Sequence, residues 1–278
     1  MNNKDLLSIA IAASLEAGEA IMKIYESDDF GVETKGDNSP LTKADLAADK
    51  IIQSHLVNTG IPILSEEGKS IPYEDRKNWK QLWIVDPIDG TKEFIKKNGE
   101  FTVNIALIEN QKTVLGVVYA PALCDLYYSS KENGSFRLQH FESLSDRQPT
   151  VKDSMLSYPE ALEGNGKATS LPLQSDRTKY TIVASRSHMS PETEEYVSEM
   201  RKKHGEVELI SKGSSLKLVM VAEGTADCYP RFAPTMEWDT AAGQAICEHA
   251  GFDVIDWETK ETMKYNREEL LNNWFLVK

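Results

Sequence analysis

Apolar side chains recur at a helical spacing in the first sixty residues. They occupy Leu6, Ile9, Ala10, Ala13, Ala17, Ile21 and Ile24, and then Ala44, Ala47, Ile51 and Leu56. A period near 3.6 residues places each set on one helix face, so the pattern predicts amphipathic helices over 4–25 and 42–57. Thr42 is expected to cap the second helix, with Asp45 in its first turn. The segment between them is rich in turn formers and is expected to be a loop.

From residue 82 the pattern changes to short apolar or alternating runs. These runs span residues 82–85, 101–108, 113–120, 126–129 and 134–138. Asn110, Pro121 and the Asn133-Gly134 pair separate them, which is typical of turns. The pattern therefore predicts a meander of antiparallel strands.

Strands and helices alternate in the second half of the chain. Strands are expected over 180–184, 207–210, 225–229, 252–255 and 274–277, and helices over 191–204, 215–223 and 238–250. Residues 143–178 are polar with little periodicity, which predicts a long exposed connection near a domain boundary. We therefore expect an α/β protein with an α+β domain at 1–145 and an α/β domain at 146–278.

Composition and charge narrow the possible functions of the chain. Of the 278 residues, 40% are hydrophobic and 27% charged, as in ordinary globular proteins, and the net charge is -13. An acidic protein repels polyanions, which argues against general nucleic-acid binding. No run is long enough to span a membrane and the start lacks a secretory signal, so we expect a cytoplasmic protein without an integral membrane segment. Peripheral association with the cytoplasmic face of the inner membrane stays open, although the sequence shows no anchor for it.

Two aspartates stand close together in "WIVDPIDGTKEF", residues 83–94. Pro87 favours an extended backbone at Asp86, so Asp86 and Asp89 are expected to point into one cleft at the end of a strand. Gly90 lets the backbone approach a ligand, and Thr91 is expected to begin a short helix with free N–H groups. On this stretch alone, a proline turn and a cation site are both open interpretations.

Other acidic residues favour the cation site. Glu66 and Glu67 end the apolar run of "ILSEEG", Asp239 begins a helix in "EWDTAAGQA", and Asp37 lies in "TKGDNSP". Considered singly, each of these acids is explained as a solvated side chain or a helix cap. Considered together, they offer a metal ion only oxygen ligands. Such a set favours Mg²⁺ over zinc, and two ions could assist the displacement of a phosphate.

Several motifs resemble a known family. The stretches "LSEEG", "DPIDGT" and "WDTAAG" are similar, in this order and spacing, to the Mg²⁺-dependent, lithium-sensitive phosphatases of the inositol monophosphatase superfamily. The further stretches "KGDNSPLTKAD", "SRSH", "GSSLK" and "YPRF" resemble its bacterial 3'(2'),5'-bisphosphate nucleotidase branch. The likeness covers nearly the whole chain. It implies a layered α-β-α-β-α sandwich.

The resemblance implies a set of metal ligands. Glu66, Asp86 and the carbonyl of Ile88 would hold one Mg²⁺, and Asp86, Asp89 and Asp239 a second. Asp86 would bridge the two ions. These ligands would also contact the substrate phosphate, apart from Asp86.

The resemblance also assigns catalytic roles. A third, weaker ion would lie near Glu66 and Asp37, and Thr91 with Asp37 would position and deprotonate the attacking water. The amides of Gly90 and Thr91 would receive the phosphate. The expected reaction converts adenosine 3',5'-bisphosphate into AMP and phosphate, and some relatives also act on the sulfated precursor.

The second phosphate of such a nucleotide would require cations and hydroxyl groups. The candidates are Arg186, His188, Ser214, Ser215, Lys217 and Arg231. Two alternatives stay open, an inositol or sugar phosphatase and a non-catalytic sensor of phosphorylated metabolites. Glu237 is unexpected beside Trp238 and Asp239, and we expect it to point outward. The sequence does not predict the oligomeric state.

Overall fold

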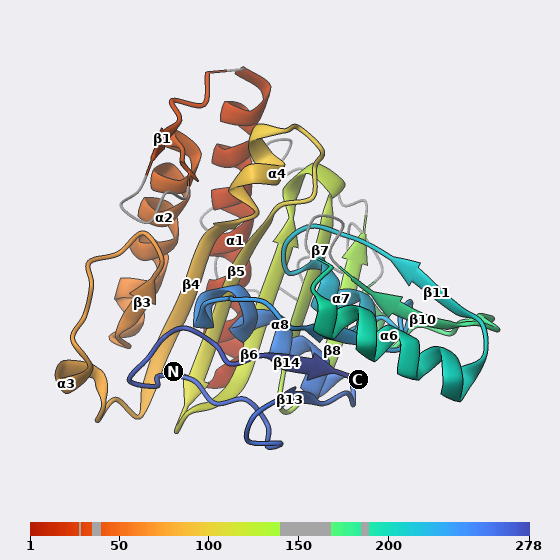
Figure 1. Cartoon of the computed structure of the whole chain (residues 1–278). Helices are drawn as coiled ribbons and strands as arrows, with labels where there is room; N and C mark the ends of the chain where they lie inside the picture. The colour runs from red at the N-terminus through yellow and green to blue at the C-terminus, as the bar shows by residue number, and fades with distance from the viewer. Residues whose placement is uncertain (28, 35–39, 140–167, 185–188) are drawn as a thin grey trace.

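The protein is described here by a computed structural model, which covers residues 1–27, 29–34, 40–139, 168–184 and 189–278 (Figure 1). Five layers stack in the order helices, sheet, helices, smaller sheets, helix. This arrangement confirms the predicted α-β-α-β-α sandwich. No helix among the described residues has the length and apolar character needed to cross a bilayer.

The first layer contains α1 (Asn3–Ser27) and α2 (Lys43–Leu56), which pack on one face of the main sheet. Both predicted helices are confirmed. The Thr42 side chain caps α2 by accepting a hydrogen bond from the Ala44 amide at 3.2 Å. Asp45 returns the contact by accepting from the Thr42 amide at 2.7 Å, so a capping box fixes where α2 begins.

The main sheet has seven strands in the order β3-β4-β5-β6-β7-β8-β9. They are β3 (Ile63–Ser65), β4 (Gln81–Asp89), β5 (Thr102–Glu109), β6 (Lys112–Ala120), β7 (Asp125–Ser130), β8 (Gly134–Gln139) and β9 (Thr169–Ser170). Only β3 and β4 are parallel, so the predicted antiparallel meander is confirmed.

The strand β4 continues further than expected. It runs through Pro87 and Ile88 to Asp89, which pairs with Thr102, and the register is irregular between Asp86 and Asp89. The chain therefore bulges at Pro87, which has no N–H to donate to a ladder, rather than leaving the sheet there. Gly90 has φ 93° and is followed directly by the short helix α4 (Thr91–Ile95).

The helices α7 (Leu216–Ala222) and α8 (Glu237–His249) cover the other face of the main sheet. Behind them lie the parallel pair β10 (Tyr180–Val183) and β11 (Val207–Ile210) and the antiparallel sheet β12-β14-β13. Its strands are β12 (Tyr229–Arg231), β13 (Val254–Asp256) and β14 (Phe275–Val277). Helix α6 (Pro191–His204) forms the outermost layer.

Two predictions about the second half need correction. The strand expected over 225–229 is confined to Tyr229 and beyond, because the amides of Thr225 and Ala226 bond back to Met220 and end α7. Within the polar stretch 143–178, most of the described residues are exposed as expected, but Thr169–Ser170 forms the short strand β9 and Leu171 is buried in the core.

Smaller elements complete the described structure. These are β1 (Glu33–Thr34), β2 (Pro40–Leu41), α3 (Tyr73–Arg76) and the 3₁₀ turns Val57–Thr59 and Pro121–Leu123. The core between the main sheet and α7 and α8 draws residues from both sides of the expected boundary at 145. The division into two domains stays a prediction.

Candidate active site

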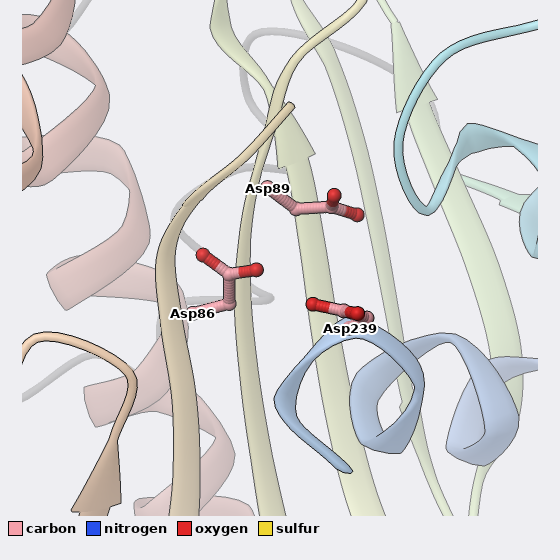
Figure 2. Close-up of side chains that lie close together, drawn as sticks. All are labelled: Asp86, Asp89 and Asp239. Atoms are coloured by element: carbon pink, nitrogen blue, oxygen red, sulfur yellow. The ribbon is translucent and has the colours of Figure 1, made fainter. Parts of the chain in front are cut away.

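Three aspartates from distant parts of the chain meet between β4 and α8. One carboxylate oxygen each of Asp86, Asp89 and Asp239 lies within 4.8 Å of the others. Figure 2 shows Asp86 and Asp89 on the bulged end of β4 and Asp239 at the start of α8. Because α8 packs across the sheet, its first turn reaches the point where β4 ends. The predicted convergence of these residues is confirmed.

The Asp86 carboxylate is deeply buried and incompletely paired. Asp86 is 1% exposed, and its Oδ1 has no hydrogen-bond partner within the described part of the chain. Burial raises the pKa of Asp86 well above its ordinary value, and the charges of Glu66, Asp89 and Asp239 raise it further. Buried carboxylates in this arrangement need a cation or a proton, and hard oxygen ligands fit a divalent ion such as Mg²⁺.

Asp239 divides its carboxylate between the helix and the cluster. Its Oδ2 accepts a hydrogen bond from the Met236 amide at 2.8 Å, which caps α8. Burial raises the pKa of Asp239 to about 8, with the charge of Asp89 as the next cause. The carboxylate is therefore costly to ionise unless a cation compensates its charge.

Ser215 forms a hydrogen bond with the Asp89 carboxylate. Its hydroxyl lies 2.8 Å from Asp89 Oδ2 and 2.8 Å from the Asp239 carbonyl oxygen, and it accepts from Asn104 at 2.9 Å. Burial raises the pKa of Asp89, while Lys217 and the Ser215 hydrogen bond oppose that shift. Ser215 is 1% exposed, so in this structure its hydroxyl positions the Asp89 carboxylate. Its contact with substrate stays a prediction.

Glu66 and Ile88 lie beside the cluster. The parallel pairing of β3 with β4 brings the Glu66 amide to 3.1 Å from the Val85 carbonyl, next to Asp86. The charge of Glu66 raises the pKa of Asp86, which places the two carboxylates close together. The carbonyl oxygen of Ile88 accepts from the Thr91 hydroxyl at 3.4 Å. Both residues are available as the ligands that the resemblance implies.

The Thr91 hydroxyl also contacts Asp45, which is not among the predicted site residues. It lies 3.3 Å from Asp45 Oδ1, while Asp45 Oδ2 accepts from the Thr42 amide and hydroxyl. Asp37, the expected partner of Thr91, lies outside the described residues. The sequence signal for Asp45 is its place in the first turn of α2 after a polar loop, where the helix dipole alone accounts for an acidic residue.

A cavity of about 650 Å³ adjoins the aspartates. Its lining includes Asp89, Asp239, Gly90, Ser214, Lys217 and Arg231. Five of the lining side chains are cationic, namely Lys92, Lys96, Lys212, Lys217 and Arg231. This is the size of a small-molecule site, and its cations contrast with the net charge of -13.

Two predicted substrate cations form part of the cavity wall. Lys217 Nζ donates to the carbonyls of Ser214 at 2.8 Å and Lys212 at 3.2 Å, and burial lowers its pKa to about 8 against the opposing charge of Asp89. Arg231 donates through one guanidinium nitrogen to the Pro234 carbonyl at 3.1 Å.

Ser214 is fixed near the aspartates, with its hydroxyl 2.9 Å from the Asp89 carbonyl oxygen. Arg186 and His188 lie outside the described residues.

The prediction that Glu237 points outward is wrong. Its side chain is 0% exposed and accepts from the Asn266 amide at 2.7 Å, the Arg267 amide at 3.0 Å and Arg267 Nε at 3.2 Å. Burial raises the pKa of Glu237, and these hydrogen bonds oppose the shift. Glu237 therefore anchors the start of α8, two residues before Asp239, to the loop at 266–267.

Comparisons with known proteins agree with this geometry. The model of the inositol monophosphatase family matches residues 2–276. The 3'(2'),5'-bisphosphate nucleotidase CysQ of Escherichia coli K12 is 43% identical over 264 residues, covering 94% of each chain. CysQ of Salmonella typhimurium is 44% identical over 270 residues, again covering 94% of each.

Solved structures give the same result. The crystal structure of CysQ from Bacteroides thetaiotaomicron is 48% identical, with a TM-score of 0.88 over 99% of this chain and 97% of that chain. The suppressor protein suhB from Bartonella henselae shares the fold at 23% identity, with a TM-score of 0.70 over 98% of this chain and 93% of that chain. The chain described here belongs to the inositol monophosphatase family.

Proposed function

We propose that this chain is a Mg²⁺-dependent 3'(2'),5'-bisphosphate nucleotidase. It would hydrolyse the 3'-phosphate of adenosine 3',5'-bisphosphate to give AMP and phosphate. The observation that carries the proposal is the position of three clustered aspartates, one buried and two partly buried, beside a cavity whose lining includes five cationic side chains. The CysQ relatives, which carry this activity in their names, support the same substrate.

The metal ligands follow from the carboxylates and the family. Glu66, Asp86 and the Ile88 carbonyl would hold one ion, and Asp86, Asp89 and Asp239 a second. A third ion would lie near Glu66 and Asp37. Bound Mg²⁺ supplies positive charge for the phosphate and lowers the pKa of water. The unpartnered Oδ1 of Asp86 and the absence of soft ligands from the three-aspartate group support this choice of metal.

The residues of the chain would orient the water and receive its proton. Thr91 Oγ1, held between Asp45 Oδ1 and the Ile88 carbonyl, would accept a hydrogen bond from the attacking water. Thr91 would pass its own proton to Asp45, because a hydroxyl can accept one proton while it donates another. Asp37 remains the alternative partner. The amides of Gly90 and Thr91 would donate to the phosphate, and the positive φ of Gly90 directs the chain for this contact.

The cavity would hold the nucleoside and its second phosphate. Its volume of about 650 Å³ exceeds what a single small polyol ring requires, and its cations offset the acidic charge of the chain. Lys217 and Arg231 contribute positive charge near Asp89 and Asp239. The same cavity would admit the sulfated precursor, and the reaction would recycle a by-product of sulfate activation.

Phosphate release from three substrates tests the proposal. The purified chain is incubated with Mg²⁺ and adenosine 3',5'-bisphosphate, adenosine 3'-monophosphate or inositol 1-phosphate. We expect the highest kcat/KM with the bisphosphate and loss of activity with a chelator. A much higher kcat/KM with inositol 1-phosphate would favour an inositol phosphatase. No release from any substrate, together with retained nucleotide binding, would favour a sensor.

A further inference from the structure

Three lysines on one wall of the cavity have no place in the site described so far. Lys92 lies in α4 and Lys96 is the residue that caps its end, four residues further along, so the two side chains lie one above the other on one side of the helix. Lys212 lines the same cavity from the loop that precedes α7. Lys92 and Lys96 are exposed, and neither has a hydrogen bond or an ion pair with any described residue.

The acidic groups on this wall leave a positive balance. Glu100 lies 3.5 Å from Lys212 and accepts from the Gly213 amide at 2.9 Å. Glu93 is the other glutamate in the lining, against the three lysines. Lys92 and Lys96 therefore line the cavity with charges that form no ion pair with a carboxylate of the described residues. In a chain of net charge -13, such a pair favours an anionic ligand.

The lysine wall is fixed relative to the metal ligands. The Ser214 hydroxyl lies 2.9 Å from the Asp89 carbonyl and 2.6 Å from the Glu100 carbonyl, which ties the two loops together. A Cβ atom at Gly213 would lie 2.6 Å from the Glu100 carbonyl oxygen, so the loops that carry Gly213 and Glu100 are closely packed. Helix α4 begins two residues after Asp89, and Lys96 lies one turn further from Asp89 than Lys92.

We propose that Lys92, Lys96 and Lys212 form the subsite for the phosphate that is not hydrolysed. This inference rests on the proposed function, since it assigns the second phosphate of the same substrate. Lys217 already donates to two backbone carbonyls and Arg231 to one, so part of their hydrogen-bonding capacity shapes the wall. The α4 lysines have all three N–H groups available to a phosphate.

Steady-state kinetics of the double variant Lys92→Gln/Lys96→Gln tests this subsite. We expect the KM for adenosine 3',5'-bisphosphate to rise at least about tenfold with kcat within about twofold. The KM for adenosine 3'-monophosphate, which lacks the second phosphate, should stay within about twofold. The control variant Lys23→Gln/Lys50→Gln has the same change in net charge on α1 and α2 and should match the wild type. Equal KM changes for both substrates would overturn the proposal.

A binding measurement separates this inference from the proposed function. Calorimetry with AMP and adenosine requires no turnover, because AMP carries only the phosphate that remains after hydrolysis. We expect the wild type to bind AMP at least about tenfold more tightly than adenosine, and Lys92→Gln/Lys96→Gln to lose that difference. Unchanged AMP affinity in the variant would overturn the subsite even if the bisphosphate is hydrolysed. Lost AMP affinity without any hydrolysis would support the subsite and contradict the proposed enzyme.

Discussion

The Thr91 hydroxyl lies 3.3 Å from Asp45 Oδ1, across the interface between α4 and α2. Asp45 is 1% exposed, and its other oxygen caps α2 through Thr42. One carboxylate therefore joins a helix cap to the hydroxyl that we propose orients the attacking water. Because of this contact, Asp45 and Asp37 are both candidates for the proton acceptor, and substitutions can distinguish them.

Asp45→Asn should lower kcat by roughly 100-fold, because the amide cannot accept a proton from Thr91. Its thermal unfolding temperature should fall by only a few degrees, since the lost cap contact is worth about 1 kcal/mol. The comparison variant is Asp37→Asn, measured with the same substrate. A near-normal kcat for Asp45→Asn, combined with a large loss for Asp37→Asn, would assign the role to Asp37.

Metal affinity should depend on pH. Burial raises the pKa of Asp239 to about 8 in the metal-free protein, and the pKa of Asp86 is also raised. Because the metal-free site takes up protons as the pH falls through about 8, Mg²⁺ must displace more protons at lower pH. The Mg²⁺ concentration at half saturation should rise on the order of tenfold between pH 8 and pH 6.5, by calorimetry. A constant affinity over this range would show that these carboxylates are already ionised without metal.

Glu237→Gln should destabilise the protein. The amide keeps one acceptor oxygen but loses the charge that pairs with Arg267, and it leaves the Arg267 side chain without an anion. Urea unfolding should show a loss of about 2 kcal/mol. Glu74→Gln, which removes an exposed partner of Lys77, should cost no more than about 0.5 kcal/mol. A Glu237→Gln variant as stable as Glu74→Gln would contradict the anchoring role.

The sequence predicted the main layers and the aspartate cluster because these depend on local signals. Helical periodicity located α1, α2 and α8, and the apolar run before Asp86 located β4, although the strand continues to Asp89. Asp239 was selected because it begins a predicted helix, and the resemblance of its motif to the family then implied its role as a metal ligand. Asp45 occupies a comparable first-turn position and also caps its helix with one oxygen, so the local pattern gave no reason to assign it a second role.

Features that depend on distant segments could not be predicted. Glu237 is buried because a loop 29 residues later supplies three N–H donors, and no pattern around Glu237 indicates that loop. The short strand β9 was not predicted, because it is defined only by its pairing with β8. The grouping of Lys92 and Lys96 with Lys212 likewise depends on the loop before α7, more than 100 residues further along the chain.

The central claim is that Asp86, Asp89 and Asp239 hold the metal ions required for phosphate release. The most direct measurement is phosphate release from adenosine 3',5'-bisphosphate by Asp89→Asn over a range of Mg²⁺ concentrations. The control is Glu109→Gln, which also replaces a carboxylate by an amide. Glu109 ends β5, at the opposite end of the strand from Thr102, the partner of Asp89. We predict a loss of about 100-fold or more in kcat for Asp89→Asn at every Mg²⁺ concentration, and normal activity for Glu109→Gln. Near-normal turnover by Asp89→Asn would contradict the metal assignment.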